Sequence, residues 1–332
     1  MTRRDLIARS LGIPVSLLAT DTLLGATPGD SVEKGRVLFD SRDDAKCDVP
    51  GCYRLEPREF TYERRPKFDL RHSGVEASTL TFPSPVETPI RENNTVHAEY
   101  FRPVGEGPFP AVLVLDILDG QQVVGRSQAM WLAQNGVASL VVHMAHYGPR
   151  RPPGSRVRLL STNVPQTLAA IRQSVLDCRC AAAWLMSRPE VDSQKLGIVG
   201  TSMGSFVSAL TAASEPRLGR ACLLLTGGGL VEAYYNHPRA KPYLPFLDVI
   251  AFKPYFEKMI APADPITYAS QLKAKRLLIV AASRDDVVPP TAATALWEAT
   301  GKQSIVWLDA THVGAALHLL PMMRAVLQHI KA

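Results

Sequence analysis

Apolar and polar residues follow two different patterns along the chain. At residues 68–83 and 95–101 they alternate, as in TVHAEYF, which predicts antiparallel strands that are buried on one face. From residue 111 onward the apolar residues instead form short continuous runs, which are typical of strands covered on both faces. The second pattern therefore predicts the interior of a layered domain.

Six of these runs alternate with segments of helical periodicity. Strands are expected at residues 111–117, 138–144, 195–200, 221–228, 276–282 and 304–310, and helices at about 126–135, 164–187, 203–214, 291–300 and 313–330. Buried strands that alternate with helices predict an α/β fold with a doubly wound, mostly parallel sheet. Its catalytic domain is expected to span residues 66–332, with the antiparallel strands leading into it.

Two segments do not fit the alternation. Residues 27–65 are polar and lack sustained periodicity, which predicts a leader that wraps the domain or is partly disordered. Residues 229–262 are rich in aromatic residues and proline, and are expected to form a small insertion over the carboxyl ends of the strands, where such sheets bind ligands. The large side chains of the insertion fit either a lipid groove or a surface that stacks on sugars. They are Tyr234, Tyr235, Tyr243, Leu244 and Phe246.

The N-terminus carries a further pattern. Arg3 and Arg4 precede a moderately apolar run, and residues 1–26 resemble a twin-arginine signal peptide, which predicts export to the periplasm or beyond. A short amphipathic helix packed on a cytoplasmic domain is the alternative interpretation. No later segment has about 18 unbroken apolar residues, so no transmembrane segment is predicted.

Charge and cysteine content narrow the choice of partners. The net charge of the 332 residues is +6, but the basic residues are scattered and form no nucleic-acid motif, so no nucleic acid partner is expected. Cys47 and Cys52 bound the turn CDVPGC, and a disulfide and two free thiols both remain open. Cys178, Cys180 and Cys222 are expected to be buried thiols, and no zinc spacing is present.

The stretch KLGIVGTSMGSF places Ser202 in a G-x-S-x-G motif. The motif alone arises by chance roughly one time in ten in a chain of this length and composition. Here it lies between a predicted buried strand and a predicted helix, which is the setting of a nucleophile elbow. Gly200 and Gly204 would relieve crowding around that turn.

Candidates for the acid and the base follow in the required order. Asp285 and Asp286 come after the fifth buried strand, in SRDDVVPP, and His312 comes after the sixth, in ATHVGAAL. The carboxyl ends of parallel strands share one rim, so both segments are expected near Ser202. A Ser–acid–His order is the one this architecture uses.

These motifs resemble those of α/β-hydrolases, from about residue 68 to the C-terminus. RPEVDSQKLGIVGTSMG and DDVVPP are similar to the dienelactone-hydrolase and prolyl-oligopeptidase-like esterase branch, whose D-x-x-V-P turn implies Asp285 as the acid and Asp286 as the alternative. DPITYA resembles a segment before the acid strand, and Asp264 in it is interpreted as a helix cap. Ser205 departs from the second glycine of many relatives.

The resemblance implies a serine esterase with an acyl-enzyme intermediate and no metal or organic cofactor. The backbone N–H of Met203 and, by position, that of Leu118 would hold the oxyanion, although LDILDG lacks the His-Gly of many relatives. In HYGPRRP, His146, Tyr147 and Arg150 are candidates for contact with substrate. Arg150 would meet an acidic or phosphate-bearing group, or else be solvated.

His143 and His146 form H-x-x-H, but no third ligand is evident, so no metal site is predicted. They are expected to face the substrate pocket or to make local hydrogen bonds. The leading hypothesis is a hydrolase of carboxylic esters, either small molecules or groups attached to a polymer. A peptidase, a lipid acyl hydrolase and a non-catalytic binding protein remain alternatives, and the oligomeric state is not predicted.

Overall fold

The computed structural model describes residues 32–42, 44–235 and 252–332. Its centre is a single ten-stranded sheet with the strand order β1-β2-β3-β4-β6-β5-β7-β8-β9-β10. The strands from β1 to β4 pair antiparallel, as do β4 and β6, and the remaining pairs are parallel. The strand bounds are β1 (Glu33–Phe39), β2 (Arg58–Leu70), β3 (Val75–Pro83), β4 (Thr95–Pro103), β5 (Phe109–Leu115), β6 (Ala138–Val142), β7 (Val191–Thr201), β8 (Arg220–Leu224), β9 (Arg276–Ala282) and β10 (Ser304–Leu308).

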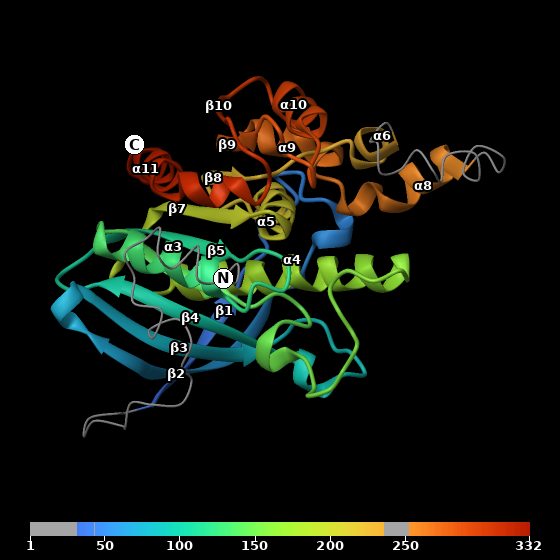
Figure 1. Ribbon diagram of the computed structural model, residues 1–332. Coiled ribbons are helices and arrows are strands. Elements are labelled where there is room, and N and C mark those ends of the chain that lie inside the picture. Colours follow the sequence, from blue (N-terminus) through green and yellow to red (C-terminus); the bar gives the residue numbers. More distant parts are fainter. Residues whose placement is uncertain (1–31, 43, 236–251) are drawn as a thin grey trace.

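Helices cover both faces of the sheet (Figure 1). On one face lie α3 (Val123–Gln134) and α11 (Leu319–Lys331), and on the other lie α4 (Val164–Met186) and α5 (Met203–Ser214). The other α-helices are α6 (Leu230–Tyr235), α8 (Phe252–Ile260), α9 (Ala269–Lys273) and α10 (Pro290–Ala299). Short 3₁₀ turns are η1 (Gly51–Tyr53), η2 (Arg71–Ser73), η3 (Arg91–Asn94), η4 (Gly148–Arg150), η6 (Ala261–Ala263), η7 (Pro265–Tyr268) and η8 (Gly314–His318).

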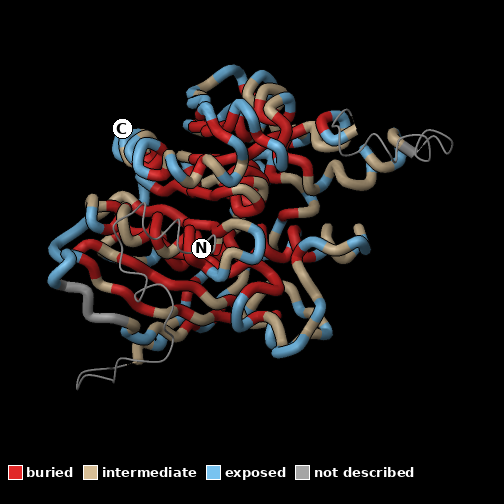
Figure 2. The backbone as a smooth tube through the Cα atoms, in the orientation of Figure 1, coloured by how far each residue is buried: buried red, intermediate tan, exposed pale blue. Residues whose placement is uncertain are grey.

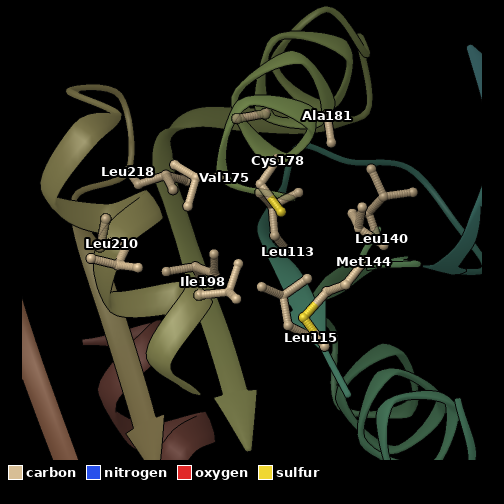
Figure 3. Packing of buried hydrophobic residues seen from close by; sticks show 14 of the residues in the cluster. Leu113, Leu115, Leu140, Met144, Val175, Cys178, Ala181, Ile198, Leu210 and Leu218 are labelled. Atoms are coloured by element: carbon tan, nitrogen blue, oxygen red, sulfur yellow. The ribbon is translucent and has the colours of Figure 1, made fainter. Parts of the chain in front are cut away.

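The core lies on both sides of the parallel strands β5 to β9, which are buried along most of their length (Figure 2). The edge strand β10, expected to be covered on both faces, is instead mostly exposed, because it has a neighbouring strand on one side only. Successive side chains of a strand point to opposite faces, so Val112 and Val114 of β5 pack with α3 and α11, whereas Leu113 packs with α4. Figure 3 shows Leu113 and Ile198 facing Val175 and Cys178 of α4. The predicted doubly wound, mostly parallel α/β sheet is confirmed, as is the burial of Cys178, Cys180 and Cys222.

The segment expected to be a polar leader differs from the expectation. Residues 33–39 and 58–65 form β1 and the first part of β2, so four antiparallel strands, not two, lead into the parallel sheet. Their inward positions are few, namely Val37, Phe39, Phe60 and Tyr62, and the residue between each pair, Leu38 or Thr61, is exposed. So sparse an alternation is hard to distinguish from a loop by sequence alone.

The segment 44–55 is fixed by a buried ion cluster. Arg179 of α4 is fully buried and donates to Asp44 at 2.5 and 3.0 Å and to Glu215 at 3.2 Å. Its guanidinium also lies over the Phe39 ring, 5.0 Å from the centroid. Cys47 and Cys52, in the same segment, are free thiols.

Two expectations concern residues outside the described part of the chain. The signal-like segment 1–26 falls there entirely, and export stays a prediction. Of the insertion, only its two ends are described, α6 and α8, and Tyr243, Leu244 and Phe246 are outside. Within the described residues, no helix is both long enough and apolar enough to cross a membrane.

Candidate active site

The turn between β7 and α5 presents Ser202 at the carboxyl end of the sheet. Its backbone lies at φ +53° and ψ −120°, which L-residues seldom adopt outside functional turns. A Cβ added at Gly200 would lie 2.3 Å from the Gly204 carbonyl oxygen, and one at Gly204 would lie 2.4 Å from the Leu115 carbonyl oxygen. Both glycines of the motif are therefore required by the close approach of backbone to backbone.

Gly204→Ala is expected to destabilise the fold by about 1–3 kcal/mol or more, because the methyl group would have to displace the main chain of β5. Urea denaturation measures this change in the free energy of unfolding. Gly51→Ala is the matched control, since a Cβ at Gly51 has no neighbouring atom within 4 Å. Equal stability of the two variants would contradict the steric argument.

The structure brings Ser202, His312 and Asp285 together in one hydrogen-bonded series. Ser202 Oγ lies 2.9 Å from His312 Nε2, and His312 Nδ1 lies 2.7 Å from Asp285 Oδ2. An ionised carboxylate can only accept, so Nδ1 carries the proton and Nε2 can accept from the serine hydroxyl. The side chain of His312 is 12% exposed and that of Asp285 2%, so the series runs from the surface inward.

The acid side of this series is held by backbone donors. The N–H groups of Val287 and Val288 both donate to Asp285 Oδ1 at 2.8 Å, which leaves Oδ2 to accept from His312. Asp286, the alternative acid, is exposed. The register expected from D-x-x-V-P therefore has the geometry a triad acid needs.

The two expected oxyanion donors lie on the elbow itself and on the loop that follows β5. Met203 is the first residue of α5, and Leu118 lies on the loop after β5, whose end packs against Gly204. Among the described residues, neither Met203 N–H nor Leu118 N–H has an acceptor. Ser205, the departure from the second glycine, donates its hydroxyl to the Ser202 carbonyl oxygen at 2.6 Å. The oxyanion roles stay predictions.

The insertion contacts the acid loop through α6. The Tyr234 hydroxyl donates to the carbonyl oxygen of Val287, and Ala233 packs on Val288 and Ala292. Asp264 caps the following η7 by accepting from Ile266 N–H, as expected, and also accepts from the N–H groups of Gly229 and Leu230 at 3.0 and 2.7 Å. The entry to the insertion is thus fixed beside the site.

The expectation that Arg150 contacts substrate or solvent is wrong. Arg150 is fully buried and pairs with Asp177 at 2.8 Å, a residue that is also fully buried. It donates further to the carbonyl oxygens of His143 and Asn93 at 2.9 and 2.7 Å. The guanidinium is buried because it pairs with Asp177, which lies 27 positions away and outside the local sequence pattern.

Arg150→Leu is expected to destabilise the protein by about 3–5 kcal/mol, because it leaves the Asp177 carboxylate buried without the guanidinium it pairs with. Thermal unfolding followed by circular dichroism measures the loss. Arg151→Leu, which removes a partly exposed guanidinium, serves as the control. A stable Arg150→Leu protein with a raised KM would instead favour the substrate-contact interpretation.

His146 and Tyr147 are also buried, at 7% and 3% exposed, and so do not present an open binding surface. His146 N–H donates to Asn93 Oδ1, and the Tyr147 hydroxyl accepts from Asp119 N–H at 3.2 Å. His143 Nε2 lies 3.3 Å from Glu99 Oε1, a local contact of the kind expected. Within the described part of the chain, no group of three or more His, Cys, Asp and Glu side chains is arranged to hold a metal ion.

The sequence patterns missed Asp116, at the end of β5. It is fully buried beneath the loop that carries Leu118, and Gly125 N–H donates to its Oδ1 at 2.9 Å. Burial raises the pKa of this carboxyl to about 6, against the opposing effect of the nearby backbone N–H groups. The sequence feature that could have indicated this buried carboxyl is the single acidic residue at the end of the apolar run AVLVLD.

Comparison with known proteins agrees with this architecture. An acetyl xylan esterase from Paenibacillus sp. R4 is similar with a TM-score of 0.65 and 20% identity, over 95% of this chain and 99% of that one. Acetyl xylan esterase 1 from Thermoanaerobacterium sp. is similar with a TM-score of 0.58 and 17% identity, over 98% and 93%. The chain has the α/β-hydrolase fold. A putative dienelactone hydrolase from Klebsiella pneumoniae shares this fold, with a TM-score of 0.51 and 18% identity over 77% of this chain and 98% of that one.

Sequence comparison finds partial matches that include the candidate site. Residues 171–319 match the prolyl oligopeptidase family, a range that includes Ser202, Asp285 and His312. Two uncharacterised proteins of Mycobacterium tuberculosis are 28% identical over 143 residues, which is 43% of this chain and 33% of each relative. The matched region thus spans about a third of the length of these relatives. The expected similarity is thus found with the prolyl oligopeptidase family over residues 171–319, and the dienelactone hydrolase shares the fold.

Proposed function

We propose that the protein is a serine hydrolase that cleaves carboxylic esters through Ser202, His312 and Asp285. The observation that carries this proposal is the continuous series of two hydrogen bonds, 2.9 and 2.7 Å long, that ends at a serine on a strained elbow. A structural serine needs neither the unfavourable backbone conformation nor a histidine oriented by a buried carboxylate.

The proposed reaction has two halves. Ser202 Oγ attacks the ester carbonyl carbon while His312 Nε2 takes its proton, and the N–H groups of Met203 and Leu118 stabilise the oxyanion. The C–O bond to the alcohol then breaks, and His312 returns the proton to the leaving oxygen. Water then attacks the acyl carbon while His312 takes a proton from it. The bond from the acyl carbon to Ser202 Oγ breaks, His312 returns the proton to Oγ, and the carboxylic acid leaves. Throughout, Asp285 orients the imidazole and stabilises its charged form.

Acetyl esters are the substrates we propose to test first. Two esterases of similar fold are named for acetyl xylan, and the chain aligns with almost the full length of both. Sequence identities of 17% and 20% indicate a shared fold only, so a preference of this protein for acetyl groups or for sugars is part of the proposal. The match to the prolyl oligopeptidase family favours peptide hydrolysis as the second candidate.

The test compares p-nitrophenyl acetate, butyrate and decanoate, acetylated xylan, and a prolyl p-nitroanilide on one purified sample. The proposal expects turnover of p-nitrophenyl esters, fastest for acetate, with release of acetate from the polymer. Turnover of the anilide without the esters would instead establish the peptidase. Export remains a separate proposal, and N-terminal sequencing of the mature protein checks whether residues 1–26 are removed.

A further inference from the structure

The loop that joins β5 to α3 has an unusual backbone. Three of its residues, none of them glycine, have positive φ angles: Asp119 at +49°, Gln121 at +52° and Gln122 at +63°. Such residues each carry an energetic cost and persist where the surroundings fix them. The loop also bears Leu118, the candidate oxyanion donor, so whatever fixes the loop also fixes that N–H group.

Asp116 is placed to do this from beneath the loop. Its side chain is fully buried, and its Oδ1 accepts from Gly125 N–H in the first turn of α3. The N–H groups of Ile117 and Gln122 also act on the carboxyl and oppose the rise of its pKa. A Cβ added at Gly120 would lie 2.5 Å from Oδ2, so the carboxyl group fills the space inside the loop.

Two of the remaining N–H groups of the loop donate to identified acceptors. Gly120 N–H donates to the Ile117 carbonyl oxygen at 3.3 Å, and Asp119 N–H donates to the buried Tyr147 hydroxyl. The N–H group of Leu118, which directly precedes Asp119, has no acceptor in the described chain, and neither has that of Gln121. On its other side, the loop adjoins the elbow. A Cβ added at Gly204 would lie 2.5 Å from the Asp116 carbonyl oxygen.

We propose that Asp116 is a positioning residue that holds the β5–α3 loop so that Leu118 N–H faces the oxyanion formed at Ser202. This inference rests on the proposed function and adds the residue that sets the oxyanion geometry. The carboxylate touches neither substrate nor Ser202. The carboxylate acts on the loop through the hydrogen bonds that it accepts from backbone N–H groups. Loss of this carboxylate is therefore expected to lower kcat more than it raises KM.

Three variants test the proposal on the full chain. Asp116→Ala removes both side-chain oxygens that can accept from the loop. Asp116→Asn keeps the shape of the side chain and one oxygen that can accept from Gly125 N–H. Asp119→Asn is the matched control, because that half-exposed carboxylate points outward to Arg151 at 3.4 Å and asparagine tolerates its backbone angles. Each protein is titrated with a fluorophosphonate, so that kcat for p-nitrophenyl acetate is expressed per reactive serine.

We expect kcat per reactive site to fall about 100-fold in Asp116→Ala, as for loss of one oxyanion donor, with KM changed less than about threefold. Asp116→Asn should recover part of that loss, and Asp119→Asn should match the wild type. If Asp116→Ala does not fold, the nearly isosteric Asp116→Asn carries the test through its own reduced kcat.

A kcat per reactive site that stays within about twofold of wild type in both Asp116 variants overturns the inference, even if fewer molecules fold. Equal losses in kcat for Asp119→Asn also overturn it, because the effect would then follow loop charge. Failure of the wild type itself to hydrolyse ester or bind the fluorophosphonate would reject the proposed function, a result distinct from these.

Discussion

Ser202→Ala is expected to lower kcat for ester hydrolysis by about 10⁶-fold, to the background set by binding and the oxyanion site alone. The variant removes the attacking oxygen but leaves the elbow, whose backbone does not depend on the hydroxyl. Initial-rate kinetics with p-nitrophenyl acetate at high enzyme concentration measures the loss. Trace contamination by wild type is excluded by purifying both proteins on separate columns.

Ser205→Ala is the matched control for this substitution. Ser205 also follows β7 and is buried, but its hydroxyl donates to the Ser202 carbonyl oxygen and does not contact His312 in the described structure. Its removal is expected to change kcat less than about tenfold, since one neutral hydrogen bond is lost. Retained activity in Ser202→Ala, with the fold intact by circular dichroism, would place the chemistry elsewhere.

Asp285→Asn is expected to lower kcat by about 10⁴-fold. An amide in place of Oδ2 either donates toward His312 Nδ1 or leaves it without a charged partner, and the wrong imidazole tautomer then faces Ser202. The bonds from Val287 and Val288 to the remaining oxygen keep the loop in place.

Asp286→Asn tests whether the loss of activity depends on which of the two neighbouring carboxylates is neutralised. This neighbouring carboxylate is exposed, so its neutralisation is expected to change kcat less than about threefold. Kinetics of the two asparagine variants on the same substrate decides between them. A larger loss in Asp286→Asn than in Asp285→Asn would assign the acid to the alternative residue and contradict the hydrogen-bond series.

Much of the parallel sheet could be predicted from its sequence because buried strands have to be apolar on both faces. The run RLLIVAA predicted β9 at its observed bounds, and the segment after the elbow predicted α5. The triad followed from the same logic. Residues placed directly after neighbouring parallel strands meet at one edge, so Ser202, Asp285 and His312 converge although up to 110 positions separate them.

The parts that escaped prediction depend on partners distant in sequence. Arg150 has no local feature that distinguishes it from a solvated arginine, and its burial follows from Asp177 on α4. β1 and the start of β2 carry only a few inward apolar side chains, so their strand character depends on pairing with the rest of the sheet. The support that Asp116 gives to a loop is likewise a matter of three-dimensional packing.

Reaction of the folded protein with a fluorophosphonate, followed by mass spectrometry of its peptides, tests the central claim most directly. The account predicts one covalent adduct on the Ser202 hydroxyl, formed in wild type and absent from Ser202→Ala and from heat-unfolded protein. It also predicts much slower labelling in a His312→Ala variant, because the hydroxyl would lack its base. No adduct on folded wild type, or an adduct on another residue that persists in Ser202→Ala, would contradict it.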